Sequence, residues 1–486
     1  MPHPPAGHRH EHAFTSFHAL EREGLAVCTR RNMLKASLAG IAGLTVPELL
    51  RAQDALAASG RPAAAKSVIL LWMTGGPSHI DTWDMKPDRP LPHRGPFRPI
   101  PTKLPGVQIC EHLPKMAAML DRFTLIRSVN ARGSNHEPNT VMQTGNPLAE
   151  PRTNSVARQY PAIGSIVAKH HGPNHPAMPP YVAFKCSDTH LAFGGYLGKQ
   201  YDPFIGNTAA VLPQYTNVGV DTGRVSTGRL LQLPAGLTPE RIRRRQTLRE
   251  GVDAVRRQVD DNPDMAALDS YQQRAVDLLL GERAREAFDL TREPERVRER
   301  YGKHLWHQEA LLARRLVERG VSFVTLDLSY HSASGTWDTH GDNIPPYGGI
   351  TSGLKPILPL YDHLVTTLVA DLEERGLLES TLVVMAGEFG RTPKITGLPQ
   401  FYKLPGRDHW GAAQTVFFAG GGVKGGQVIG ETDAVGGSPK SDGQTPENFA
   451  ATIYESLGIP RLATWDDSEG RPHAVYNGEP IPGLLG

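Results

Sequence analysis

Four short segments of this sequence combine histidine with acidic side chains in patterns that suit a metal site. They are Gly75–Asp84, Trp337–Asn343, Gly387–Thr392 and Gly406–Trp410. Carboxylate and imidazole groups without thiolates are ligands for Zn²⁺, Mn²⁺ or Fe, and with fewer histidines for Mg²⁺ and Ca²⁺. Ions held in this way polarise a phosphate-like or sulfate-like group and activate a nucleophile. One Asp-x-His sequence alone is more often a hydrogen-bonded turn, but four such segments together indicate a common site.

Two further segments could bind an anion. Ser134–Pro147 reads as a loop that leads into a helix, whose first backbone amides favour negative charge; a capped helix with polar surface residues is the open alternative. Gly420–Gly426 follows a strand but lacks the Lys-Ser/Thr ending of a phosphate-binding loop, so it predicts a turn. The sequence has no Gly-x-Ser-x-Gly elbow, which argues against a serine hydrolase of that class.

Buried strands precede three of the four metal-type segments. Val68–Met73 is a continuous apolar run, and Val321–Leu326 and Thr381–Met385 each follow an amphipathic helix that ends at glycine. This order predicts an α/β fold in which helices sandwich a mostly parallel central sheet. Ligands of such sheets bind in loops beyond the carboxyl ends of the strands. The fourth segment precedes the strand expected at Thr415–Ala419 and can turn toward the same edge. Another strand is expected at 123–126, and helices at 113–120, 311–319, 360–375 and 448–457.

The composition excludes several classes of protein. Among 486 residues, 52 Lys and Arg balance 50 Asp and Glu, which argues against a nucleic-acid partner. Three cysteines cannot form a disulfide framework or a thiolate zinc site.

A charged, glycine-poor region at about 238–319 predicts a helical insertion whose basic runs are matched by nearby acidic residues.

The first part of the chain has the pattern of an export signal. Thr29–Lys35 contains paired arginines, the apolar stretch Ala36–Pro47 follows, and small residues at Ala55–Ala57 offer a cleavage site. We therefore expect residues 1–57 to be a twin-arginine signal region and 58–486 to be a single domain, exported by the twin-arginine machinery to the periplasm or beyond. A short helix after an unstructured tail is the alternative. The apolar stretch is too short for a membrane span, so none is expected in the mature chain.

The motifs together resemble the exported bacterial "domain of unknown function 1501" family, and through it the alkaline phosphatase/sulfatase superfamily. The resemblance covers nearly the whole mature chain and implies the α/β sandwich of that superfamily. It places Glu388 at the position of a metal-binding Asp and His409 at the position of a late metal-binding His. It places Asp338 and His340 at the Asp and His of another metal site, and Asp81 at the Asp after the first strand.

The sequence also departs from that superfamily. Phe389 stands where a His ligand is expected, and Asn135–Gly145 is similar to the sulfatase segment that begins at the nucleophile. The Cys/Ser-x-Pro-Ser-Arg signature is missing there, and no cysteine is present to become formylglycine. Sulfatase chemistry of the usual kind is therefore not expected.

The leading hypothesis is an exported metal-dependent hydrolase of phosphate or sulfate esters, acting on a small-molecule or glycan anionic ester. One or two divalent ions (Zn²⁺, Mn²⁺ or Ca²⁺) would be held by acidic and histidine side chains, with Ser134, Thr140 or a metal-activated water as the nucleophile. The alternative is a binding or scaffold protein that keeps the hydrolase fold without the reaction. Arg391 would clamp an anionic oxygen, and His79 and His136 would serve as further ligands or acid/base groups. The candidate metal ligands are His79, Asp81, Asp338, His340, Glu388 and His409, and the candidate catalytic residues are Ser134, His136, Thr140 and Arg391.

Overall fold

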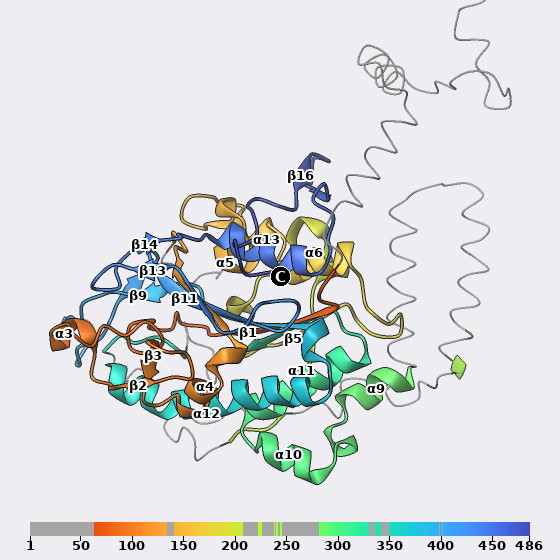
Figure 1. The fold of residues 1–486 in the computed structure, drawn as a ribbon. Helices are drawn as coiled ribbons and strands as arrows, with labels where there is room; N and C mark the ends of the chain where they lie inside the picture. Colours follow the sequence, from red (N-terminus) through yellow and green to blue (C-terminus); the bar gives the residue numbers. More distant parts are fainter. Residues whose placement is uncertain are drawn as a thin grey trace, which may run out of the picture. The chain divides into compact units, whose positions relative to one another are not determined.

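An eight-stranded sheet forms the centre of the protein in a computed structural model (Figure 1). The structure describes residues 63–133, 140–207, 222–225, 281–329, 336–341, 349–397 and 402–486, together with 238, 240, 241, 244, 399 and 400. The strand order is β12-β4-β11-β8-β1-β7-β5-β6. The strands are β1 (Ser67–Trp72), β4 (Thr124–Val129), β5 (Tyr181–Phe184), β6 (Phe204–Ile205), β7 (Phe323–Asp327), β8 (Thr381–Ala386), β11 (Gln414–Ala419) and β12 (Gln427–Ile429).

The sheet is mostly parallel, as predicted, and β11 is the exception. β1 pairs in parallel with β7 and β8, whereas β11 runs antiparallel to both of its neighbours, β4 and β8. The chain between β8 and β11 forms the short pair β9 (Gly390–Arg391) and β10 (His409–Trp410) and contains no crossover helix among its described residues. A parallel return would need such a crossover, so the chain comes back antiparallel. The start of β11 therefore lies at the edge where β8 ends.

Helices cover both faces of the sheet and give the protein two apolar cores. Ile69 and Leu71 of β1 point into one core with α11 (Leu305–Arg319) and α12 (Gly349–Glu374). Val68, Leu70 and Trp72 point into the other core with α6 (Ile163–His170) and α13 (Pro446–Ser456). Figure 1 shows these helix layers on opposite sides of the strands. Successive residues of β1 point alternately into the two cores, so all of them are buried. This explains why β1 reads as a continuous apolar run.

The remaining elements are short. The other α-helices whose bounds lie in the described ranges are α3 (Leu91–Arg94), α4 (Pro114–Ala118), α5 (Thr140–Thr144), α9 (Glu282–Phe288) and α10 (Glu295–Tyr301). Two-stranded sheets are formed by β2 (Pro99–Pro101) with β3 (Gln108–Cys110), β13 (Glu431–Thr432) with β14 (Pro439–Ser441), and β15 (Thr464–Asp466) with β16 (Pro472–Ala474). No helix in the described ranges is long and apolar enough to cross a membrane.

Two helices begin earlier than the sequence predicted. α12 starts at Gly349 rather than at 360, and it contains Pro356 and Pro359, which oppose a helix interior. Burial of Leu354, Ile357 and Leu358 in its first half offsets that cost. α11 starts at Leu305 rather than at 311. The expected signal region, residues 1–57, lies outside the described residues. Of the expected helical insertion at about 238–319, most of the part that precedes residue 281 also lies outside them.

Candidate metal centre

The loops beyond the carboxyl ends of β1, β7 and β8 meet at one edge of the sheet. The backbone N–H of Trp337, in the loop that follows β7, donates to the carbonyl of Thr74 after β1 at 3.0 Å. The backbone N–H of Gly75 donates to Glu388 Oε1 after β8 at 2.7 Å. Pairing of His409 with Arg391 brings the segment before β11 to the same place. The convergence follows from parallel strands and the reversed direction of β11.

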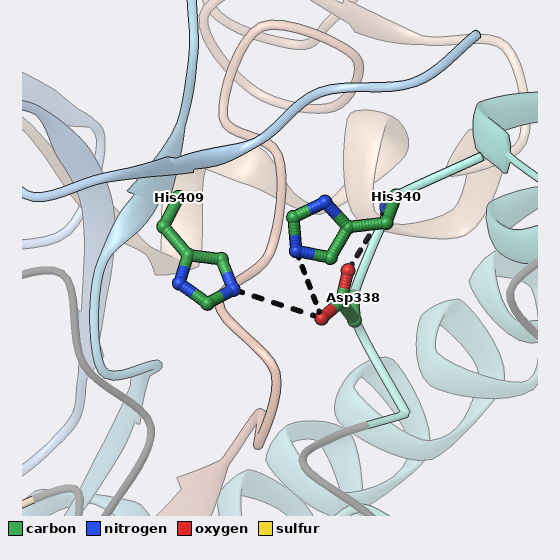
Figure 2. Close-up of side chains that lie close together, drawn as sticks. All are labelled: Asp338, His340 and His409. Carbon is green, nitrogen blue, oxygen red and sulfur yellow. Dashed lines mark hydrogen bonds and ion pairs between the residues drawn. The ribbon is translucent and has the colours of Figure 1, made fainter. Parts of the chain in front are cut away.

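Asp338, His340 and His409 form a compact group at this edge (Figure 2). One ligand atom from each residue lies within 4.8 Å of the other two. Asp338 Oδ2 is 3.5 Å from His340 Nε2 and 3.8 Å from His409 Nε2. The Asp338 side chain is 3% exposed, whereas those of His340 and His409 are 12% and 23% exposed. The group is therefore closed on the carboxylate side and open to solvent beside the imidazoles.

The donor set and its spacing fit a divalent ion. Ions such as Zn²⁺ bind imidazole nitrogen and carboxylate oxygen at about 2.0–2.2 Å, which places two tetrahedral ligands about 3.3–3.5 Å apart. The two contacts of Asp338 Oδ2, at 3.5 and 3.8 Å, are close to that separation. Two imidazoles and one carboxylate suit Zn²⁺ and Mn²⁺ better than Ca²⁺, which prefers six to eight oxygen ligands. Asp338, His340 and His409 are thus the residues that could hold an ion.

Arg391 fixes the orientation of the Asp338 carboxylate. Its guanidinium is fully buried, and Nη1 lies 3.0 Å from Asp338 Oδ1. Its Nε donates to the carbonyl of Gly76 at 2.8 Å, and its Nη2 donates to the carbonyl of Gly75. We expected Arg391 to contact an anionic substrate oxygen. The structure instead surrounds it with protein acceptors, so it positions Asp338 and joins the loops after β1, β7 and β8.

The environment of His340 keeps its imidazole neutral. Burial lowers the pKa of His340 to about 4, and the nearby Arg391 and His409 act in the same direction against the opposing effect of Asp338. Above that pH the ring carries no charge and its unprotonated nitrogen is available as a ligand. The ring stacks on Tyr402 with centroids 4.7 Å apart and an angle of 10° between the planes. Tyr402 belongs to no recognised motif, so this contact could not be predicted from the sequence.

Asp81 and His79 lie in the predicted loop but have other partners. Arg407 Nε and Nη2 contact the two carboxylate oxygens of Asp81 at 2.7 and 3.1 Å, and both side chains are fully buried. Asp81 is thus a structural ion-pair partner here, not a member of the Asp338 group. His79 is also buried, and its Nε2 bonds to the carbonyl oxygen of Gly436 at 2.8 Å. Burial lowers the pKa of His79, which keeps the ring neutral.

Glu388 and Phe389 lie beside the group without belonging to it. Glu388 is buried and accepts the hydrogen bond from Gly75, so it ties the loop after β8 to the loop after β1. The ring of Phe389, at the position where the resemblance predicts a His ligand, packs against His409 with centroids 4.7 Å apart. Among the described residues, Asp338, His340 and His409 are the group of acidic and histidine side chains whose ligand atoms lie close enough together to hold a metal ion.

Apart from Arg391, the predicted catalytic residues belong to the segment 134–140, at or before the start of α5. Ser134 and His136 lie outside the described residues, in the segment that precedes α5. Thr140 is the first residue of α5, and its side chain is likewise outside the description. The expectation that this segment leads into a helix is confirmed by α5.

Comparison with known proteins gives a family but no activity. The model of a family described as "Protein of unknown function (DUF1501)" matches residues 65–485. No curated protein matches the chain. Similar solved structures include the sulfatase PsFucS1 from Pseudoalteromonas sp., at 11% identity and a TM-score of 0.34, over 84% of this chain and 72% of that one.

Two other solved structures are similar at the same level. The phosphonate monoester hydrolase SpPMH from Silicibacter pomeroyi has 12% identity and a TM-score of 0.34, over 86% of this chain and 76% of that one. An alkaline phosphatase from the Antarctic bacterium TAB5 has 13% identity and a TM-score of 0.34, over 81% of this chain and 98% of that one. Similarity this distant assigns no activity, so the function has to be argued from the site.

The buried pair of Arg407 and Asp81 should be essential for stability. In Arg407→Met a buried carboxylate loses its counter-charge, so we expect the free energy of unfolding to fall by about 3–5 kcal/mol. Urea unfolding followed by circular dichroism measures it. The double variant Arg407→Met/Asp81→Asn should recover part of the loss, because no charge is left buried without a partner. Arg98→Met, which removes a pair whose arginine is 85% exposed, should cost less than about 1 kcal/mol. Equal losses in Arg407→Met and Arg98→Met would contradict this account.

Proposed function

Because this chain belongs to the DUF1501 family of proteins of unknown function, we propose a function from its own chemistry: an exported metal-dependent hydrolase of phosphate or sulfate esters. The observation that carries the proposal is the group of Asp338, His340 and His409 at the loop edge of the sheet. Three protein ligands with solvent beside them are typical of catalytic sites, where a coordination position stays open for substrate. Structural sites are instead closed by a fourth protein ligand.

The residues around the group support a reaction with an anionic ester. A bound Zn²⁺ or Mn²⁺ would act as a Lewis acid toward an oxygen of the phosphate or sulfate group. His340 and His409 present their imidazoles on the solvent side, where such an oxygen can approach. Arg391 orients the Asp338 carboxylate from the protein side. The site therefore favours a small-molecule or glycan ester that carries negative charge.

The nucleophile is part of the proposal. We assign it to the segment that leads into α5 or to the first residue of that helix, with Ser134 or Thr140 as the attacking hydroxyl and His136 as its acid/base partner. A helix that follows such a loop directs its first amides toward an anion. A water molecule is the other candidate.

A second candidate function is a binding protein that keeps the fold without the reaction. Two observations favour a binding protein. Phe389 occupies a position where a histidine metal ligand was expected, and protein acceptors surround the Arg391 guanidinium. An Asp338–His340–His409 group without a bound ion would then be a polar binding surface for a neutral or cationic partner.

Metal content provides the first test. We expect purified protein that has been stripped with chelator and equilibrated with Zn²⁺ or Mn²⁺ to retain one ion per chain. Inductively coupled plasma mass spectrometry measures the metal content. Loss of a direct ligand in His340→Ala, His409→Ala or Asp338→Asn should weaken binding more than the roughly 10–100-fold caused by losing an outer-shell partner. His171→Ala, which changes a partly buried histidine in another part of the chain, is the control. A wild type that retains no ion, or ligand variants that bind like the control, would contradict the metal centre.

Hydrolysis separates the two candidate functions. We expect the protein to cleave aryl phosphates or aryl sulfates when Zn²⁺, Mn²⁺ or Ca²⁺ is added. His340→Ala and His409→Ala should lower kcat/KM by at least about 100-fold, because Lewis-acid assistance is worth several kcal/mol. Release of the aryl alcohol is followed by absorbance, with His171→Ala as the control. No cleavage with any of the three metals would favour the binding protein.

Export is tested on the intact chain. We expect the double change Arg30→Lys/Arg31→Lys to retain the protein in the cytoplasm of a bacterium that has the twin-arginine pathway. Cell fractionation and immunoblotting measure its location, and Arg9→Lys is the control. Equal export of the double variant and the control would overturn this part of the proposal.

A further inference from the structure

Two segments near the Asp338 group contain basic residues but no acidic ones. Residues 392–407, which link β9 to β10, include two lysines and one arginine and no Asp or Glu. Residues 89–110, which contain α3, include three arginines and one lysine and likewise no Asp or Glu. Basic and acidic residues balance over the whole chain, 52 against 50, so these segments are a local excess of positive charge.

The buried guanidinium of Arg407 holds the two segments together. Its Nη1 donates to the carbonyl of Pro393 at 2.6 Å, and its Nη2 donates to the carbonyl of His93 at 2.8 Å. Lys394 and Arg94 each follow directly after one of these two acceptors. Because one guanidinium binds both carbonyls, the backbones of Lys394 and Arg94 lie close together although they are far apart in the sequence.

The segment 392–407 also lies against the loop that holds His340. The ring of Tyr402 stacks on His340 with centroids 4.7 Å apart. The backbone N–H of Leu404 donates to the carbonyl of Gly341 at 2.8 Å. Lys403 stands between these two contacts in the sequence, so its backbone is held beside the imidazole side of the metal-type group, the side that is open to solvent.

Three cations of these segments are free to meet an anion from outside. Arg94, Lys394 and Lys403 are exposed, and none of them forms an ion pair with a residue that the structure describes. An acidic neighbour, Asp408, is half-exposed, and its Oδ1 accepts from the backbone N–H of His409 at 2.8 Å. Its carboxylate thus contacts the backbone of the metal-type group rather than the three cations.

We propose that Arg94, Lys394 and Lys403 form a basic rim that binds a second anionic group of the substrate, and that the substrate is a glycan with several sulfate or phosphate esters. Such a polymer repeats one kind of ester, so it can present one group to the metal-type group and another to the rim. One exposed cation gains little from one anion, but several contacts to one chain add up. The balanced charge of the whole chain argues against nucleic acid. The role of the rim in a substrate site rests on the proposed function, whereas its binding of a polyanion does not.

Binding is measured without metal, by the fluorescence anisotropy of a labelled dextran sulfate oligomer added to chelator-treated protein. We expect Arg94→Gln, Lys394→Gln and Lys403→Gln each to weaken binding about twofold to fivefold, and the triple variant about tenfold or more. The triple variant should also depend less steeply on salt, because fewer counterions are released. Lys66→Gln is the matched control, since Lys66 is exposed and directly precedes β1, at the opposite edge of the sheet. All four positions are exposed, so the circular dichroism spectrum and Tm should not change.

Hydrolysis then shows whether the rim belongs to the substrate site. With Zn²⁺ or Mn²⁺ added, dextran sulfate should inhibit the cleavage of nitrophenyl phosphate or nitrophenyl sulfate competitively in the wild type and in Lys66→Gln. In the triple variant the inhibition should be about tenfold weaker or more. The kcat and KM for the small ester should stay unchanged in the triple variant, because this ester has no second anionic group for the rim.

Each outcome decides a part of the proposal. A wild type that does not bind dextran sulfate, or a triple variant that binds it like Lys66→Gln, overturns the rim whether or not esters are cleaved. Binding that depends on the rim but does not compete with the small ester overturns its place in the substrate site. Stronger binding of a single-stranded DNA oligomer of equal charge overturns the glycan assignment. Absence of any hydrolysis overturns the proposed function and the rim's role in a substrate site, while anisotropy still shows whether the rim binds a polyanion.

Discussion

A buried guanidinium has to find acceptors for its N–H groups inside the protein, and this requirement at Arg391 organises the edge of the sheet. Its three nitrogens contact the carbonyls of Gly75 and Gly76 and the carboxylate of Asp338. These partners come from loops that follow different strands, so one side chain joins segments that are far apart in the sequence. Another buried arginine at this edge, Arg407, does the same for Asp81 and the segment that contains His409.

The position of the candidate ligands follows from that arrangement. Asp338 is held from the protein side by Arg391, which leaves its other oxygen directed at the two imidazoles. His340 is limited by Tyr402 and faces Asp408, and His409 is packed against Phe389. Preorganisation of this kind lowers the cost of binding an ion or a charged substrate group, because the ligands do not have to be collected from mobile positions.

The pattern of apolar runs and glycines was enough to predict the fold. β1, β7 and β8 lie within one or two residues of the predicted strands, because a strand buried on both faces must be continuously apolar. α12 was less predictable. Its prolines oppose a helix locally, and only the burial of its first half against the core explains why it begins at Gly349.

The sequence by itself determined which residue types were available at the site: acidic and histidine side chains in loops after strands, with few cysteines. It could not tell which of them meet, since His79, Asp81, Glu388 and the ligands of the Asp338 group all stand in similar loops. Tertiary structure decided that question. Arg407 neutralises Asp81, Gly75 bonds to Glu388, and the antiparallel β11 turns His409 back toward Asp338 and His340. These choices depend on strand direction and on which buried charges find partners, and both are settled only when distant segments pack together.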